Sequence, residues 1–164
     1  MPNYWKIPGV PHKGWSLDDV KDIREDGQEE WETPYETCMM CGNEKIRFVH
    51  IVSHPEMLED FRVGCVCAEN MTNDYINPKR REKDLRNRAS RRSNWMGKQW
   101  KFSKSGNRYL KIDGKIVVIF QDKRTNKYKI SIDEIFGKKS FAELKDAKIA
   151  AFKGIEYLKE IGEW

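Results

Sequence analysis

The sequence lacks the features of membrane-spanning, secreted and disordered chains. Its longest apolar run is Ile116–Phe120, whereas a transmembrane helix needs roughly 18–20 such residues, and no apolar signal segment follows Met1. Only 38% of the 164 residues are hydrophobic and 35% are charged, so any core must be compact. Aromatic residues still make up 12%, which excludes a disordered chain. We therefore expect a folded cytoplasmic protein of one domain, or of two very small ones.

Cysteine is also scarce, and the four cysteines form two close pairs. Without a secretion signal, such pairs are more typical of metal-binding thiolates than of disulfides. Cys38-Met-Met-Cys41-Gly42 has the spacing of a zinc knuckle, in which the glycine permits the positive φ of the closing turn. The second pair is Cys65-Val-Cys67. We predict one structural zinc ion bound by Cys38, Cys41, Cys65 and Cys67, which leaves no position for an activated water.

The segment between the cysteine pairs predicts the remainder of a treble-clef-like zinc module. Residues 45–52 and 61–63 have the patterns of two strands in a hairpin, and a short helix is expected to begin near Cys67. Two alternatives stay open. The cysteines could be reduced and metal-free, or His50 or His54 could replace one cysteine as a ligand.

Acidic and basic side chains are unevenly distributed along the chain. Residues 1–78 carry 7 basic and 15 acidic side chains, whereas residues 79–104 carry 11 basic and 2 acidic ones. The segment 79–104 therefore has a net charge of +9 within a chain of net charge +5. This concentration of positive charge predicts contact with the phosphates of DNA or RNA.

A helix is predicted over residues 78–96, with Asn77 as N-cap and Pro78 at its first position. Arginine binds phosphate through a planar fork, and tryptophan can stack on bases. The alternative is a solvated helix, or one whose arginines pair with acidic residues near the N-terminus. The candidate nucleic-acid-binding residues are Arg80, Arg81, Arg86, Arg88, Arg91, Arg92, Trp95, Lys98, Trp100, Lys101, Lys127 and Lys129.

The C-terminal residues predict a three-stranded antiparallel sheet with one helix. Strands are expected over 107–112, 115–121 and 127–132, with Asp113-Gly114 as a two-residue hairpin turn. The run Ile116–Phe120 predicts a central strand that is buried on both faces. Ser140 and Glu143 form a capping-box pattern at the start of a helix that runs to about residue 161.

The whole chain is thus predicted to be α+β, in four segments. Residues 1–37 form an irregular acidic arm, 38–77 the zinc module, 78–104 the basic helix and a linker, and 105–164 the sheet with its helix. This last segment resembles the DNA-binding fold of ethylene-response factors and integrase arm-binding domains. That resemblance implies that the exposed face of the sheet enters the major groove, with Lys111, Lys115, Lys127 and Lys129 as candidates for groove contacts.

A second resemblance spans nearly the full length. It is carried by Trp5-Lys-Ile-Pro-Gly-Val-Pro-His12, by Asp22-Ile-Arg-Glu-Asp-Gly27, by the knuckle, by Val63-Gly-Cys-Val-Cys-Ala-Glu69 and by Asn77-Pro78. These motifs are similar to those of an uncharacterised family of bacterial and phage zinc-binding proteins. The family brings no activity to transfer, but it implies a small accessory protein of bacterial or phage genomes.

The function expected from these patterns is non-enzymatic binding of nucleic acid by a zinc-stabilised accessory protein. One alternative is a metal-dependent nuclease of the HNH type, with His50 or His54 as base and carboxylates such as Asp60 or Glu69 at a divalent ion. The other is a protein-interaction adaptor or inhibitor in phage–host conflict, whose acidic front half binds a basic partner. No membrane partner is expected.

Overall fold

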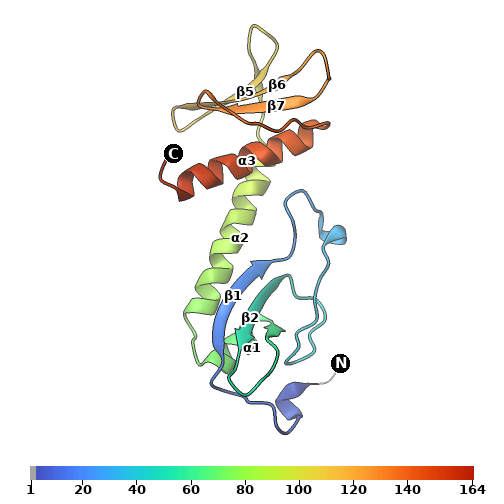
Figure 1. Ribbon diagram of the computed structural model, residues 1–164, viewed down its shortest axis with the longest axis vertical. Coiled ribbons are helices and arrows are strands. Elements are labelled where there is room, and N and C mark those ends of the chain that lie inside the picture. The colour runs from blue at the N-terminus through green and yellow to red at the C-terminus, as the bar shows by residue number, and fades with distance from the viewer. Residues whose placement is uncertain (1–2) are drawn as a thin grey trace. The chain divides into compact units, whose positions relative to one another are not determined.

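The computed structural model describes residues 3–164 and is α+β, as predicted (Figure 1). The chain divides into two compact units, Met1–Ala89 and Ser90–Trp164, which we call unit 1 and unit 2. The division falls within the predicted segment 78–104. Each unit has its own antiparallel sheet. None of the helices formed by residues 3–164 combines the length and the hydrophobicity needed to cross a membrane.

Unit 1 contains a three-stranded sheet of order β1-β2-β3. Its elements are β1 (Ser16–Asp22), β2 (Phe48–Ser53), β3 (Phe61–Val63), α1 (Cys65–Thr72) and the first part of α2 (Asn77–Met96), with short 3₁₀ turns at Tyr4–Lys6 and Glu30–Glu32. The hairpin β2–β3 and the helix after it confirm the expected elements. Strand β1 lies in the arm predicted to be irregular. The strand was not predicted because it contains aspartates, which are unfavourable in strands. Its pairing with β2 is irregular between Leu17 and Asp19.

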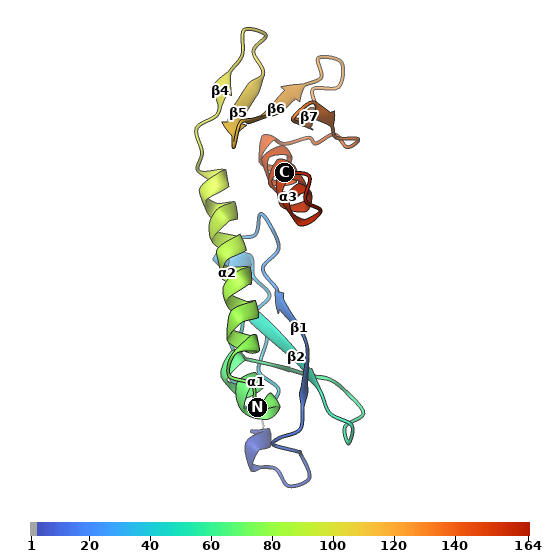
Figure 2. The ribbon, with the colours of Figure 1, turned by 90° about the vertical axis from the view of Figure 1, so that its left-hand side faces the viewer.

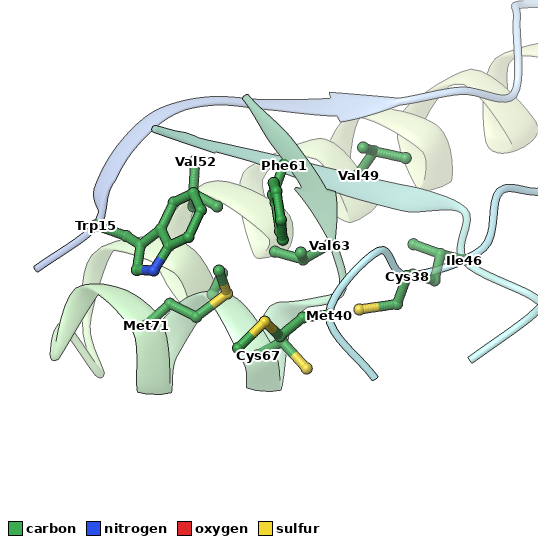
Figure 3. Packing of buried hydrophobic residues seen from close by; sticks show 11 residues of the cluster. Trp15, Cys38, Met40, Ile46, Val49, Val52, Phe61, Val63, Cys67 and Met71 are labelled. Atoms are coloured by element: carbon green, nitrogen blue, oxygen red, sulfur yellow. The ribbon is translucent and has the colours of Figure 1, made fainter. Parts of the chain in front are cut away.

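The core of unit 1 is built around aromatic and sulfur-containing side chains (Figure 3). The Trp15 and Phe61 rings lie 4.8 Å apart between their centroids, and Met40 and Met71 are fully buried beside them. Cys38 and Cys67 belong to the same cluster. Two of the four candidate metal ligands are therefore core residues.

Unit 2 contains a five-stranded sheet of order β4-β5-β6-β7-β8, whereas three strands were predicted. Its elements are the end of α2, β4 (Lys101–Phe102), β5 (Arg108–Ile112), β6 (Lys115–Gln121), β7 (Tyr128–Ile132), β8 (Ile135–Phe136) and α3 (Leu144–Glu160). The three predicted strands are the central ones, and the two additions are edge strands of two residues each, too short to leave a periodic pattern. Asp113 and Gly114 both have positive φ, as their hairpin turn requires.

Helix α3 packs against one face of this sheet (Figures 1 and 2). Val117 and Ile119 are buried under it, whereas Ile116 on the other face is 48% exposed. The prediction that this strand is buried on both faces is therefore wrong, because one helix covers one face only. The capping-box prediction is also wrong. The backbone of Phe141 pairs with Tyr128, which keeps this segment extended, and α3 starts only at Leu144.

Candidate functional site

Three of the four cysteines come together in unit 1. The sulfur atoms of Cys38, Cys41 and Cys67 all lie within 4.8 Å of one another, so the cluster can hold a metal ion. The first two lie in the turn after residue 36, and Cys67 lies in the first turn of α1. Gly42 closes the knuckle with a φ of +81°, and its N–H donates to the carbonyl of Cys38 over 2.8 Å. This is the role that the sequence predicted for the glycine.

Hydrogen-bond donors point at these sulfurs, as expected for metal-binding thiolates. Trp5 Nε1 donates to Cys67 Sγ over 3.4 Å, and the backbone N–H of Cys41 donates to Cys38 Sγ over 3.5 Å. A hydrogen bond from Cys67, together with backbone N–H groups, lowers the pKa of Cys38 to about 5. The same interaction raises the pKa of Cys67, since its proton is shared with Cys38. The buried sulfurs of Cys38 and Cys67, together with that of the exposed Cys41, form a donor set that suits Zn²⁺.

Cys65 is not in this cluster. It opens α1, two residues before Cys67, and its sulfur lies in a second group with His50 and Glu82. Burial, together with the charges of Glu82 and Glu69, raises the pKa of Cys65 to about 12. The close spacing of the second cysteine pair on one helix places the two side chains in different directions. Helical geometry rotates neighbours two positions apart by about 200°.

The two candidate histidines also lie outside the three-cysteine cluster. His50 is fully buried on β2. His54 follows β2, and its Nε2 contacts the carbonyl oxygen of Lys13 over 3.1 Å. Asp60 is exposed and Glu69 is 4% exposed. Among residues 3–164, neither carboxylate belongs to a group of possible metal donors that contains a histidine.

Several arginines of α2 make ion pairs within their own unit. In unit 1, Arg81 pairs with Asp19, and Arg88 binds Asp26 through two hydrogen bonds of 2.9 Å. The Arg86 guanidinium lies 4.3 Å from the centre of the Phe48 ring. This is the alternative that the sequence left open, in which acidic residues of the N-terminal region meet the basic helix. A guanidinium fork already occupied by a carboxylate must break that pair to bind phosphate.

The remaining candidate nucleic-acid-binding residues are of two kinds, those that contact other side chains of unit 2 and those that are exposed. In unit 2, Arg91 binds Glu156 through two hydrogen bonds, and Arg92 is half-buried. Trp95 is 4% exposed, with its Nε1 donating to the carbonyl of Lys148, and Trp100 packs edge-on against it. Both rings serve the core of unit 2. Exposed positions are held by Arg80, Lys98, Lys101 and Lys127.

The face of the unit 2 sheet opposite α3 carries a row of side chains from all five strands. The register aligns Lys101, Tyr109, Val118, Ser131 and Phe136 across the sheet. Flanking pairs on the same face are Lys111 with Ile116 and Phe120 with Lys129. We call this set the outer face.

The outer face is partly open to solvent. Phe136 is 68% exposed and meets Phe120 edge to face at 6.0 Å, while Lys101 and Lys111 are exposed. The sequence indicated Lys101, Lys111 and Lys129 but missed Tyr109, Phe120 and Phe136. Strand alternation could have placed the first two rings on this face, whereas Phe136 depended on an edge strand that leaves no pattern. Lys115, also predicted for this face, alternates with Ile116 along β6 and therefore lies on the opposite face, with Val117.

No protein-family model, curated protein or solved structure matches the chain. The architecture and the cysteine cluster are therefore the basis for any statement about function.

Proposed function

We propose that the chain is a non-enzymatic, zinc-stabilised protein that binds single-stranded nucleic acid through the outer face of unit 2. The observation that carries this proposal is the combination of three lysines and three aromatic rings on one partly exposed sheet face. Aromatic rings on a sheet stack on unpaired bases, and lysines between them neutralise the phosphates.

The charge of unit 2 supports the same function. Residues 90–164 carry 18 basic and 9 acidic side chains, a net charge of +9, whereas residues 1–89 carry 13 and 17, a net charge of −4. The positive excess of the whole chain therefore belongs to the unit that bears the outer face. An attractive field of this kind raises the rate of encounter with a polyanion.

In this proposal, zinc bound by Cys38, Cys41 and Cys67 has a structural role in unit 1. Two of these three sulfurs lie in the core, so binding the ion and packing the core are one event. Structural zinc takes four ligands; the sequence predicted Cys65 as the fourth, but the Cys65 sulfur lies in the second group and not with these three.

Binding of fluorescent oligonucleotides at several salt concentrations tests the proposed function. Replacing Lys101, Lys111 and Lys129 together with alanine should flatten the dependence of log affinity on log salt by about 0.7 for each phosphate that is no longer neutralised. Phe136→Ala should weaken binding to single strands by about 5- to 100-fold, which corresponds to about 1–3 kcal/mol per stacked base.

Matched controls separate the outer face from general effects of charge and exposure. Alanine at Lys145, Lys153 and Lys159, which are exposed on α3, removes the same charge elsewhere in unit 2. Phe102 is 63% exposed but pairs with Arg108 in the register of the opposite face, so Phe102→Ala is the control for Phe136→Ala. Tighter binding to duplex than to single strands would contradict the stacking mode. Failure to bind DNA and RNA of either form would refute the function and favour a protein partner.

A further inference from the structure

A second cluster of metal-ligating side chains lies in unit 1, away from the three-cysteine cluster. His50 on β2, Cys65 at the start of α1 and Glu82 on α2 each place one donor atom within 4.8 Å of the other two. Three elements that are separate in the sequence converge at this point. The convergence joins the strand, the short helix and the long helix of the unit around one polar centre.

His50 is fully buried, and its hydrogen-bonding environment is unsatisfactory for a neutral ring. Its Nδ1 lies 3.3 Å from the carbonyl oxygen of Phe48, and its Nε2 lies 3.3 Å from that of Pro78. A neutral imidazole has one N–H and can donate to one carbonyl only. The other nitrogen turns a lone pair toward an oxygen. Metal binding would remove this mismatch: one nitrogen would turn from its carbonyl oxygen to the ion, and the other would keep donating to its own carbonyl.

Glu69 adds a buried carboxylate at the edge of the cluster. It is 4% exposed and lies one turn after Cys65 on α1, with its Oε1 3.8 Å from Cys65 Sγ. Within residues 3–164, its Oε2 accepts no hydrogen bond, and Lys79 Nζ forms an ion pair with it at 3.3 Å. Lys79 is itself 67% exposed. Burying a carboxylate oxygen that has no hydrogen-bond partner costs free energy of folding. A further positive charge near Glu69 would therefore stabilise this unit.

The charges that face the cluster are dominated by acidic groups. Glu82 contacts Arg86 over 3.5 Å, and Glu69 contacts Lys79, but both basic side chains are at least 60% exposed. Two carboxylates and a thiol thus share a site whose cations lie at its surface. A divalent cation at the centre would replace repulsion between carboxylates by attraction to a common ion.

We propose that His50, Cys65 and Glu82 form a second metal site for a zinc-like divalent cation, with the Glu69 carboxylate next to Cys65 as a further negative charge. Nitrogen, sulfur and oxygen donors together favour Zn²⁺ over Mg²⁺ or Ca²⁺, which take oxygen ligands. The site ties α1 and α2 to β2 and gives Cys65 a role distinct from that of the cysteine cluster. The proposal is independent of nucleic-acid binding.

Zinc stoichiometry of the full chain tests this site. The protein is saturated with Zn²⁺, dialysed to remove loosely bound metal and measured by native mass spectrometry. The wild type should retain two ions. Glu82→Gln should retain one, with affinity at the second site reduced about 100-fold or more, since loss of an outer-shell partner alone costs about 10- to 100-fold. Asp84→Asn, an exposed carboxylate on the same helix, should retain two.

Two further measurements keep the test decisive. Cadmium-loaded wild type should give two ¹¹³Cd resonances, one from a sulfur-rich site and one from a mixed site, and Glu82→Gln should lose only the second. Circular dichroism verifies that each variant is folded. One zinc ion in the wild type, or two in Glu82→Gln, would overturn the proposal. If the wild type binds one ion, and Cys65→Ser lowers the affinity for it while Glu82→Gln does not, then Cys65 is a ligand of the cysteine cluster.

Discussion

The two units of this chain are stabilised in different ways. Unit 1 contains all four cysteines, and two of them are core residues beside Met40 and Phe61. Unit 2 contains no cysteine, and its core is formed by aliphatic and aromatic side chains between α3 and the sheet. The comparison teaches that a small chain can reach stability by two routes. In unit 1, where the regular elements are short, cysteines that can hold a metal ion are part of the core, whereas the core of unit 2 forms between a sheet and a long helix.

The units also use charge differently. Unit 1 has a net charge of −4 and binds several of its arginines internally, through pairs such as Arg47 with Asp22 and Arg62 with Glu36. Unit 2 has a net charge of +9, and its lysines on the outer face have no such acidic residues in the same rows of the sheet. Unit 1 therefore uses much of its charge in internal ion pairs, whereas unit 2, which also contains the pair of Arg91 with Glu156, keeps a large positive excess.

Removing the metal should have the largest effect and should separate the units. Zinc binding to small modules contributes about 10–16 kcal/mol, so a strong chelator, or Cys67→Ala, should unfold unit 1 and leave unit 2 folded. Hydrogen exchange should show loss of protection in β2 and retained protection in β6. Re-addition of zinc to the chelated protein is the control. Equal loss of protection in both units would break the comparison.

Truncation of the core of unit 2 should have the opposite pattern. Phe152 is 3% exposed on α3, and Phe152→Ala should destabilise unit 2 by about 3–5 kcal/mol through reduced burial and the resulting cavity. Chemical denaturation followed separately in each unit by NMR should show a shift for unit 2 only, with zinc content unchanged. Tyr157→Ala, at a 60% exposed position of the same helix, should have little effect. Loss of zinc from the Phe152 variant would show that the units are coupled.

A close approach between α3 and β7 provides a finer test of packing in unit 2. A Cβ at Gly154 would lie 2.6 Å from Ile132 Cδ1, so Gly154→Ala should destabilise the unit by about 1–3 kcal/mol despite the better helix propensity of alanine. Ile132→Val removes the clashing methyl group. In that background Gly154→Ala should cost less than in the wild type, as measured by thermal unfolding. Equal costs in both backgrounds would show that this close approach does not limit the packing.

The ion pair of Glu36 with Arg62 should give the smallest effect, confined to unit 1. The hydrogen bond from Arg62 lowers the pKa of Glu36, so the pair contributes stability above the ordinary glutamate pKa of about 4.3 and loses it as the pH falls through the lowered value. Both side chains are about one-third exposed, so Glu36→Gln should cost about 1 kcal/mol or less at neutral pH.

The pH dependence of that difference is measurable by denaturation of the zinc-saturated protein. The gap between wild type and Glu36→Gln should stay constant from pH 7 to about 4.3 and narrow only in stronger acid. Glu56→Gln, an exposed carboxylate in the same unit, is the control. A gap that already narrows near pH 6 would assign the difference to another titrating group.

The sequence alone determined the local elements that have strong signals. Asp113-Gly114 predicted its hairpin because both positions need positive φ, and Pro78 with the absence of glycine before residue 97 predicted the long helix. Asn77 is the first residue of that helix and not its N-cap, since the Asp74 side chain accepts from the N–H groups of Ile76 and Asn77. Cys38, Cys41 and Gly42 predicted the knuckle, because two thiolates and a tight turn are a local requirement of metal binding. These features depend on residues that are close in the chain.

The tertiary structure decided the features that depend on distant residues. Strand β1 contains unfavourable aspartates and exists through its pairing with β2, and β4 and β8 exist only as edges of a sheet that other strands build. Arg88 pairs with Asp26, 62 positions away, which is the internal ion pairing that the sequence left open as an alternative to phosphate contact. The position of Cys65 beside His50 and Glu82 likewise required three elements to meet. Residue type and spacing indicate which interactions a side chain can make. The packing of the whole unit determines which residue it contacts.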